Sequence, residues 1–202
     1  MPLAFAGFPH ADGRILGFAL APSADGLMDD PGFRAALRAI APMDGGTGRR
    51  VLRLHRFGLT LSPTLEPAKV SLDPALYTAT SSTFASVTPI VLDRHLKQDG
   101  PARQTEIAAQ IAAACRNIGL PDPQVVVPDK HSAVEGAVSA EPAGRSPDWM
   151  RWRLPTSLAS RTLTHAVIRF SERVDGPMIL GAGRFVGLGL CRPVDAEGPH
   201  VP

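Results

Sequence analysis

The sequence predicts an α+β protein made of two compact ferredoxin-like (RRM-like) units, residues 1–80 and 81–202. Apolar residues make up 44% of the chain, and they alternate between strand-like and helical spacing. Twenty prolines and nineteen glycines divide the chain into short elements. Over residues 84–170 the predicted order is strand, helix, strand, strand, helix, strand. This order is typical of an antiparallel sheet with helices on one face, which leaves the other face free.

The first unit opens with a strand and a well-signalled helix. Residues 15–21 (ILGFALA) predict a strand that follows a turn. Asp30 is a suitable N-cap and Pro31 suits the first helical position, so a helix begins there. Apolar residues then recur at helical spacing until Pro42 ends the pattern.

A basic strand follows this helix. Residues 50–57 alternate, with leucines on one face and Arg53 and His55 on the other, which predicts a half-buried strand. Residues 63–74 and 140–147 have the composition of loops.

The second unit carries the strongest helix signal. Residues 84–92 predict a strand, and residues 103–118 predict a helix with one apolar stripe and with Gly119 beyond its end. Residues 124–127 predict another strand.

Three weaker or later elements complete this unit. Residues 131–139 are a candidate strand, and residues 149–160 are a candidate helix despite Pro155. Residues 163–170 predict a strand whose Ala166, Ile168 and Phe170 face inward, with His165 and Arg169 on the other side.

Within the segment 176–193, four glycines crowd into nine positions around Arg184, namely Gly181, Gly183, Gly187 and Gly189. It lacks the spacing of a dinucleotide fingerprint, because Val186 stands where a glycine is needed, and it lacks the Gly-Lys-Ser/Thr of a phosphate loop. Two interpretations remain open. The glycines let a ligand approach the main chain beside Arg184, or they form a tight hairpin.

Composition and charge exclude several classes of protein. The net charge is only +2, and the two cysteines have neither metal-ligand spacing nor a disulfide framework. The N-terminus has no basic signal region, and no apolar run approaches the roughly 18 residues of a membrane span. We therefore expect a soluble, cytoplasmic protein with no cofactor and no membrane partner. Arginines gather at 49–56 and 145–192, which are candidate anion-binding surfaces.

Three stretches resemble one known family. The C-terminal run, HAVIRFSERV followed by GPMILGAGRFVGLGL, resembles the glycine-rich signature of the RAMP superfamily of CRISPR-associated RNA-binding proteins. FPHADGRILGFAL and VTPIVLDRHLK are similar to the second half of the fused type I-U (I-G) subunit, where a crRNA-handle-binding half precedes a crRNA-processing endoribonuclease half. Members are about twice as long, so the resemblance implies that this chain is the processing half alone.

The resemblance implies a ferredoxin-like RAMP fold and metal-independent cleavage of CRISPR repeat RNA to mature crRNA. It also implies that the product stays bound and that other subunits of a type I interference complex are partners. Two alternatives remain open. The chain is a non-catalytic RAMP subunit that binds the crRNA end, or, less well supported, a small-molecule enzyme with a phosphate ligand.

Metal-independent RNA cleavage needs a general base, a general acid and cations beside the phosphate. Histidine suits both proton transfers. We expect His10, in the turn PHADG, as the first catalytic candidate and His95, in DRHLK, as the second, with Lys97 beside it and Arg94 as a phosphate clamp. Simpler interpretations are a turn residue for His10 and a solvated helix start for His95.

The remaining candidates are contacts to RNA. His165 and His55 are expected to contact RNA rather than to transfer protons, and His131 is a reserve candidate. Trp149 and Trp152 are interleaved with arginines, which fits base stacking or ordinary packing. The predicted RNA-binding residues are Arg53, Arg94, Arg169, Gly181, Gly183, Arg184, Gly187 and Gly189.

Overall fold

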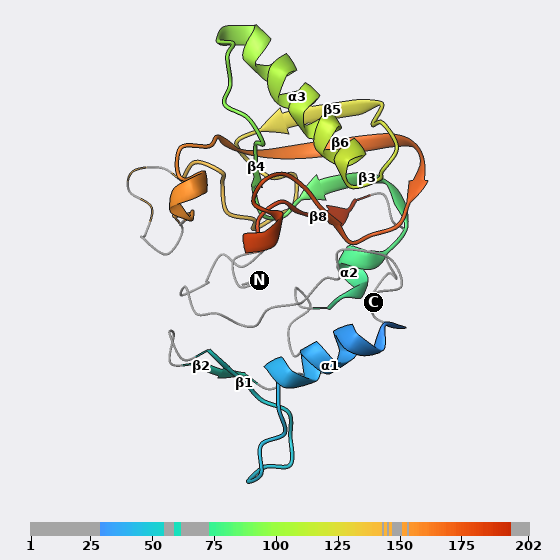
Figure 1. Cartoon of the computed structure of the whole chain (residues 1–202). Coiled ribbons are helices and arrows are strands. Elements are labelled where there is room, and N and C mark those ends of the chain that lie inside the picture. The colour runs from blue at the N-terminus through green and yellow to red at the C-terminus, as the bar shows by residue number, and fades with distance from the viewer. Residues whose placement is uncertain are drawn as a thin grey trace.

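A computed structural model describes residues 29–54, 59–61, 73–142, 144, 146, 151–152 and 154–194, which form a mixed α+β fold (Figure 1). The helices are α1 (Pro31–Ile40), α2 (Ala75–Thr78) and α3 (Gly100–Asn117), with two 3₁₀ turns, η6 (Thr156–Leu158) and η7 (Arg184–Val186). The strands are β1 (Leu52–Leu54), β2 (Leu59–Leu61), β3 (Ser81–Ser86), β4 (Ile90–Val91), β5 (Val125–Asp129), β6 (Leu163–Val174), β7 (Met178–Ile179) and β8 (Leu190–Pro193). The predicted α+β class is confirmed.

Six strands form the main sheet, and all of its strand pairs are antiparallel. Its order is β4-β6-β3-β8-β7, and β5 also pairs with β6. The 12-residue β6 is the longest strand and pairs with β3, β4 and β5, so it organises the sheet. The strand predicted at 163–170 is confirmed, and it extends to Val174.

The strand predicted at 84–92 is interrupted. β3 pairs with one part of β6, and β4 pairs with the part nearer to its start, at Thr164 and Leu163. Between β3 and β4 the main chain does not pair with β6. The N–H of Val87 donates to the carbonyl of Leu190 instead, and Pro89 has no N–H to donate. One predicted strand therefore becomes two strands.

The helix predicted at 103–118 is confirmed as α3, which begins at Gly100. Gly119 has a φ of +83° just beyond its end, a left-handed conformation that favours glycine and stops the helix. The strand predicted at 124–127 is confirmed as β5.

The main core lies between α3 and one face of the sheet (Figure 1). Ile107 and Ile111 of α3 are buried against Phe84 and Ile168 of the sheet. Phe84 also meets Phe170 edge to face, with ring centroids 6.4 Å apart. Each such buried side chain stabilises the fold by about 1.5–3 kcal/mol, so this layer holds α3 in place.

The second face of the sheet is partly covered. A smaller cluster of Tyr77 from α2, Val87 and Leu190 lies there. Val127 of β5 is 54% exposed on this face and Arg169 of β6 is also exposed, so part of it is open. The expected free sheet face therefore exists only in part.

His165 is fully buried, so its predicted contact with RNA is wrong. Its Nε2 lies 2.9 Å from the carbonyl oxygen of Val138, and its Nδ1 lies 2.9 Å from the hydroxyl of Ser86. The segment that supplies Val138 covers this end of the strand. Alternation along β6 did not show that cover, because it comes from a distant part of the chain.

α1 begins and ends as predicted. The side chain of Asp30 accepts a hydrogen bond from the N–H of Phe33, and the helix ends before Pro42. Its apolar face is only partly covered, because Ile40 is 50% exposed. Of the strand predicted at 50–57, residues 52–54 are observed as β1, which pairs with β2, whereas His55 and residues 56–57 lie outside the described residues.

Two weaker predictions are not confirmed. Residues 131–139 contain no strand, and within the described part of 149–160 only the short η6 turn is helical. Trp152 donates from Nε1 to the carbonyl of Ser139 at 2.8 Å, so it takes part in packing this irregular segment. The strand predicted at 15–21 lies outside the described residues, and the boundary between the two predicted units stays a prediction.

We expect Gly189→Ala to lower the free energy of unfolding by about 3 kcal/mol. Gly189 has a φ of +80°, and an added Cβ would overlap the carbonyl oxygen of Leu180, so strain and overlap act together. Urea unfolding measures the loss. Gly144→Ala is the control, because an added Cβ there meets nothing within 4 Å. Equal stability of the two variants would contradict this packing.

We expect acid to destabilise the protein through His165. Burial is the main cause that lowers its pKa below the usual 6.5, which outweighs the hydrogen bonds to Val138 and Ser86. The unfolded chain therefore binds a proton that the folded chain resists, and stability falls as the pH drops below about 6.5.

His165→Gln removes this titration but keeps an amide able to hydrogen-bond. The drop in unfolding free energy between pH 7.5 and 5.5 should shrink by about 1 kcal/mol. Gln104→Ala, which replaces an exposed residue that does not titrate, should keep the drop of the wild-type protein. An unchanged drop in the first variant would show that His165 does not govern acid stability.

Candidate functional site

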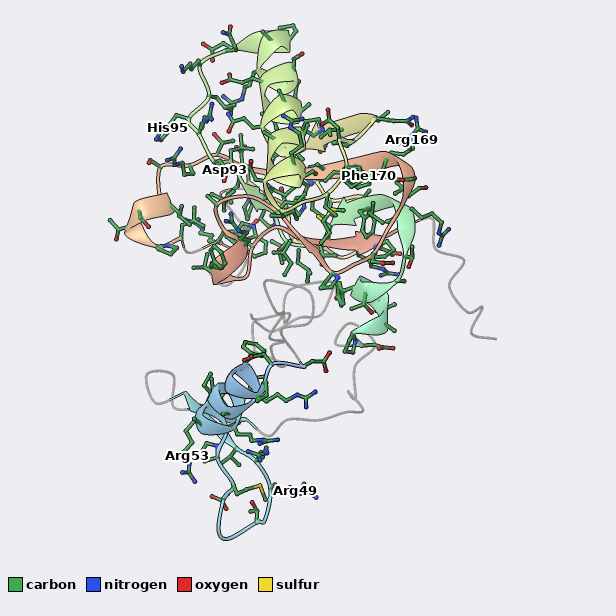
Figure 2. All side chains as sticks on the ribbon, turned by 45° about the vertical axis from the view of Figure 1, so that its right-hand side comes forward. Arg49, Arg53, Asp93, His95, Arg169 and Phe170 are labelled. Carbon is green, nitrogen blue, oxygen red and sulfur yellow. The ribbon has the colours of Figure 1, made fainter. Side chains whose placement is uncertain are left out.

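A pocket of about 550 Å³ lies between α3, the loop that follows β4, and the η7 turn. Four of its residues, Arg94, His95, Lys97 and Arg184, were predicted as site residues from two separate sequence motifs. Figure 2 shows His95 on the loop beside α3. The lining residues of this basic pocket are Asp93, Arg94, His95, Lys97, Glu106, Ala109, Gln110, Ala113, Asn117 and Arg184.

The loop after β4 is attached to α3 through its main chain. The carboxylate of Glu106 accepts hydrogen bonds from the N–H groups of Lys97 and Gln98, each at 2.9 Å. The amide oxygen of Gln110 accepts one from the N–H of Arg94 at 3.0 Å. A charged acceptor makes such bonds stronger than neutral ones, so α3 sets the path of the loop.

These contacts leave the side chains of the loop available. Leu96 turns inward and packs against the main core, whereas Arg94, His95 and Lys97 are exposed. The loop therefore presents three basic side chains to one pocket.

Arg184 reaches the same pocket because the glycine-rich segment packs against β4. The N–H of Ala182 donates to the carbonyl of Val91 at 2.9 Å, and Gly181 forms a parallel bridge with the same residue. A Cβ added at Gly183 would lie 2.6 Å from the side chain of Val91, so only glycine allows this approach.

The hairpin interpretation of the glycine-rich segment is confirmed, because β7 pairs with β8. Gly187 and Gly189 both adopt a positive φ, at +90° and +80°. The N–H of Gly189 also donates to the carbonyl of Pro89. The glycines thus contact their own chain and position the η7 turn, which exposes Phe185.

Three cationic side chains of the basic pocket, Arg94, Lys97 and Arg184, outnumber its two carboxylates, Asp93 and Glu106. Arg94, Lys97 and Arg184 carry permanent positive charge, and none of them forms an ion pair with an acidic residue among those described. The carboxylate of Glu106 is already bound to two main-chain N–H groups. Arg184 donates to the carbonyl of Gly181 at 3.3 Å, and a phosphate oxygen would meet three cations that form no ion pair.

The other predicted RNA-binding arginines do not line this pocket. Arg53 lies on β1 (Figure 2), and its guanidinium is 2.7 Å from the carboxylate of Asp44. Hydrogen bonds from Thr47, then from Gly46, together with the nearby Arg53, hold the pKa of Asp44 below its usual value. Arg169 is exposed on β6, on the side away from α3.

His10 lies outside the described residues, so its catalytic role stays a prediction. His131 is exposed, and its main-chain N–H donates to the carboxylate of Asp129 in a turn. Among the described residues, His95 is the histidine that lines the basic pocket.

The wall of the basic pocket that α3 contributes was not predicted from the sequence. Glu106, Gln110, Ala113 and Asn117 recur at i, i+4, i+7 and i+11, which is one helical stripe beside the buried one. The spacing was readable in the sequence. The sequence does not show that this stripe faces the loop after β4, because the loop and α3 are brought together only by their packing on the sheet.

The cysteines have no chemical role in this pocket. Both are free and buried, and burial raises the pKa of Cys115 to about 12 and that of Cys191 well above its usual value. In the described part of the chain, no group of three or more His, Cys, Asp or Glu side chains could hold a metal ion. No helix in that part is long and apolar enough to cross a membrane.

Comparison with known proteins gives one family match. Residues 64–193 match the family described as "CRISPR-associated protein, GSU0054 family". The matched range contains both the loop after β4 and the glycine-rich segment, and it begins after Arg53. No curated protein and no solved structure matches the chain.

We expect Glu106→Ala to loosen the loop after β4 without unfolding α3. The N–H groups of Lys97 and Gln98 would lose their acceptor, so their hydrogen exchange should accelerate about tenfold or more. Gln104→Ala, an exposed position on the same helix, is the control. Unchanged exchange at both amides would show that Glu106 does not hold the loop.

Proposed function

Because the chain belongs to the CRISPR-associated GSU0054 family, we propose that it is an endoribonuclease that cleaves CRISPR repeat RNA to mature crRNA without a metal ion. The observation that carries the proposal is the convergence of Arg94, His95, Lys97 and Arg184 in the basic pocket. A histidine beside cations that form no ion pair can supply one of the two proton transfers of RNA cleavage and stabilise the charge on the phosphate.

The cations of the pocket bind the substrate in this proposal. RNA carries one negative charge per nucleotide, and arginine and lysine bind phosphate oxygens through charge-assisted hydrogen bonds. Arg94 and Lys97 lie on one element and Arg184 on another, so together they bind a phosphate from two directions. Such contacts position the RNA, whereas contacts to the bases select its sequence.

The reaction is an attack of the substrate's 2′-hydroxyl on the adjacent phosphorus. The 2′-oxygen forms a bond to phosphorus, the bond from phosphorus to the 5′-oxygen breaks, and the products are a 2′,3′-cyclic phosphate and a 5′-hydroxyl. One proton leaves the 2′-oxygen and one joins the departing 5′-oxygen. His95 takes the first proton, and Lys97 and Arg184 stabilise the negative charge of the transition state.

His95 replaces His10 as the first candidate for this proton transfer. It is exposed, and a main-chain scaffold holds the loop on which it lies. The predicted role of His10 remains the competing possibility, and the same assay tests it. The second proton transfer has no assigned residue among those described.

The finer relationship is part of the same proposal. We place the chain in the RAMP superfamily, as the processing half of the type I-U (I-G) fused subunit, with a ferredoxin-like arrangement. An antiparallel sheet with α3 on one face supports this assignment. The chain would keep its crRNA product and assemble with other subunits of a type I interference complex.

A non-catalytic role is the second candidate. Among the described residues, His95 is the single histidine in the basic pocket, while the reaction needs both an acid and a base. That observation favours a subunit that binds the crRNA end and leaves cleavage to another protein. Both candidates use the same RNA surface.

We expect the purified protein to cleave labelled repeat RNA in EDTA, with a cyclic phosphate on the upstream product. His95→Ala should slow single-turnover cleavage by about a hundredfold or more, because a general base typically contributes 10²- to 10⁴-fold. RNA affinity should stay within about threefold, since phosphate contacts dominate binding. His131→Ala is the matched control, because it removes an exposed histidine outside the pocket.

Each outcome separates the candidates. A substrate with a 2′-deoxy nucleotide at the cut site should bind and stay intact. Normal cleavage by His95→Ala together with none by His10→Ala would transfer the catalytic role to His10. Binding without any cleavage supports the non-catalytic subunit, and strict dependence on Mg²⁺ would overturn the mechanism.

A further inference from the structure

The η7 turn exposes two apolar side chains beside the basic pocket. Phe185 is 76% exposed and Val186 is 45% exposed. By contrast, Phe84 and Phe170 are buried in the main core. Large aromatic side chains are usually buried, so an exposed ring beside a charged pocket indicates a binding surface.

Packing and hydrogen bonds fix both ends of the η7 turn. On one side Gly183 is enclosed by Val91 and Leu188, and on the other side Gly187 adopts a left-handed φ of +90°. The N–H of Val186 donates back to the carbonyl of Gly183. Because both ends of the turn are fixed, its tip projects outward.

Phe185 is also coupled to a pocket cation. The guanidinium carbon of Arg184 lies 4.4 Å from the centre of the Phe185 ring, and Arg184 lines the basic pocket. The cation covers one face of the ring, and the high exposure of Phe185 shows that the rest is accessible. A single turn therefore combines a phosphate ligand with an aromatic surface.

We propose that Phe185 is a stacking platform for one unpaired nucleobase of the RNA whose phosphate lies in the basic pocket. This inference rests on the proposed function, since it concerns the same substrate. Exposed aromatic rings next to basic side chains bind single-stranded RNA by stacking, because every base has a π-face. Arg184 holds the ring from one side and the base covers the other, which places the neighbouring phosphate toward the pocket.

Charge selects RNA over a protein partner as the occupant. A protein that covered Phe185 and Val186 would also have to neutralise Arg184 and the loop cations next to it. RNA satisfies both requirements at once, because bases and phosphates alternate along its chain. A protein partner is therefore an outcome of the test.

The test combines substitutions at Phe185 with abasic positions in the RNA. Abasic sites placed one by one along a non-cleavable 2′-deoxy repeat RNA should reveal one position that lowers affinity for the wild-type protein about tenfold. Phe185→Leu should lower affinity for the intact RNA by a similar factor. It should lose nothing more when the same base is removed, because ring and base act as a pair.

Matched variants separate stacking from other effects. Phe185→Trp should keep the affinity and the sensitivity to that abasic site, since it keeps an aromatic ring. Val127→Ala, which truncates an exposed apolar residue on β5, should leave both unchanged. Fluorescence of 2-aminopurine at the identified position should be quenched by the wild-type protein and not by Phe185→Leu.

The remaining outcomes distinguish this inference from the proposed function. If Arg94→Ala weakens RNA binding while Phe185→Leu binds every RNA normally, the pocket binds RNA and the platform is wrong. If neither variant changes RNA binding, the proposed function fails as well. If Phe185→Leu binds RNA normally but no longer assembles with CRISPR-associated subunits, the exposed ring is a protein contact and the inference is overturned.

Discussion

Close main-chain contact between β4 and the glycine-rich segment joins the two chemically informative motifs of this protein. The N–H of Ala182 donates to the carbonyl of Val91, the last residue of β4 and the residue just before the basic loop. Together with the bond from the N–H of Gly189 to the carbonyl of Pro89, that contact fixes the glycine-rich segment beside the loop. This contact requires glycine, because a side chain at Gly181 or Gly183 would collide with β4. The basic pocket, and every function proposed for it, depends on this close approach of two backbones.

Local signals in the sequence were enough for the best-defined elements. The Asp30 cap fixed the start of α1, and the apolar stripe with Gly119 predicted α3. Sequence reasoning failed where the partner was distant in the chain. His165 alternates like a surface residue, yet the carbonyl of Val138 covers it. Strand alternation identifies two faces but does not say which remote segment packs on the second one.

For a similar reason, the sequence predicted the residues of the candidate site but not their arrangement. Residue type identified Arg94, His95 and Lys97, because a histidine between cations suits proton transfer beside a phosphate, and it identified Arg184, because an arginine among glycines points to an anion. Their convergence depends on tertiary packing, which no local pattern encodes. The role of Glu106 was hidden as well. A carboxylate on a basic surface suggests charge neutralisation, whereas here it binds main-chain N–H groups and leaves the cations free.

Attachment of the loop by its backbone has a consequence for how this protein can change. Since Glu106 and Gln110 hold main-chain groups, the path of the loop does not depend on which side chains occupy positions 94, 95 and 97. In this short segment the main chain is held by α3, whereas the exposed side chains are available to contact a ligand. Substitutions at the exposed positions can therefore alter the charge that the basic pocket presents at little expense in stability.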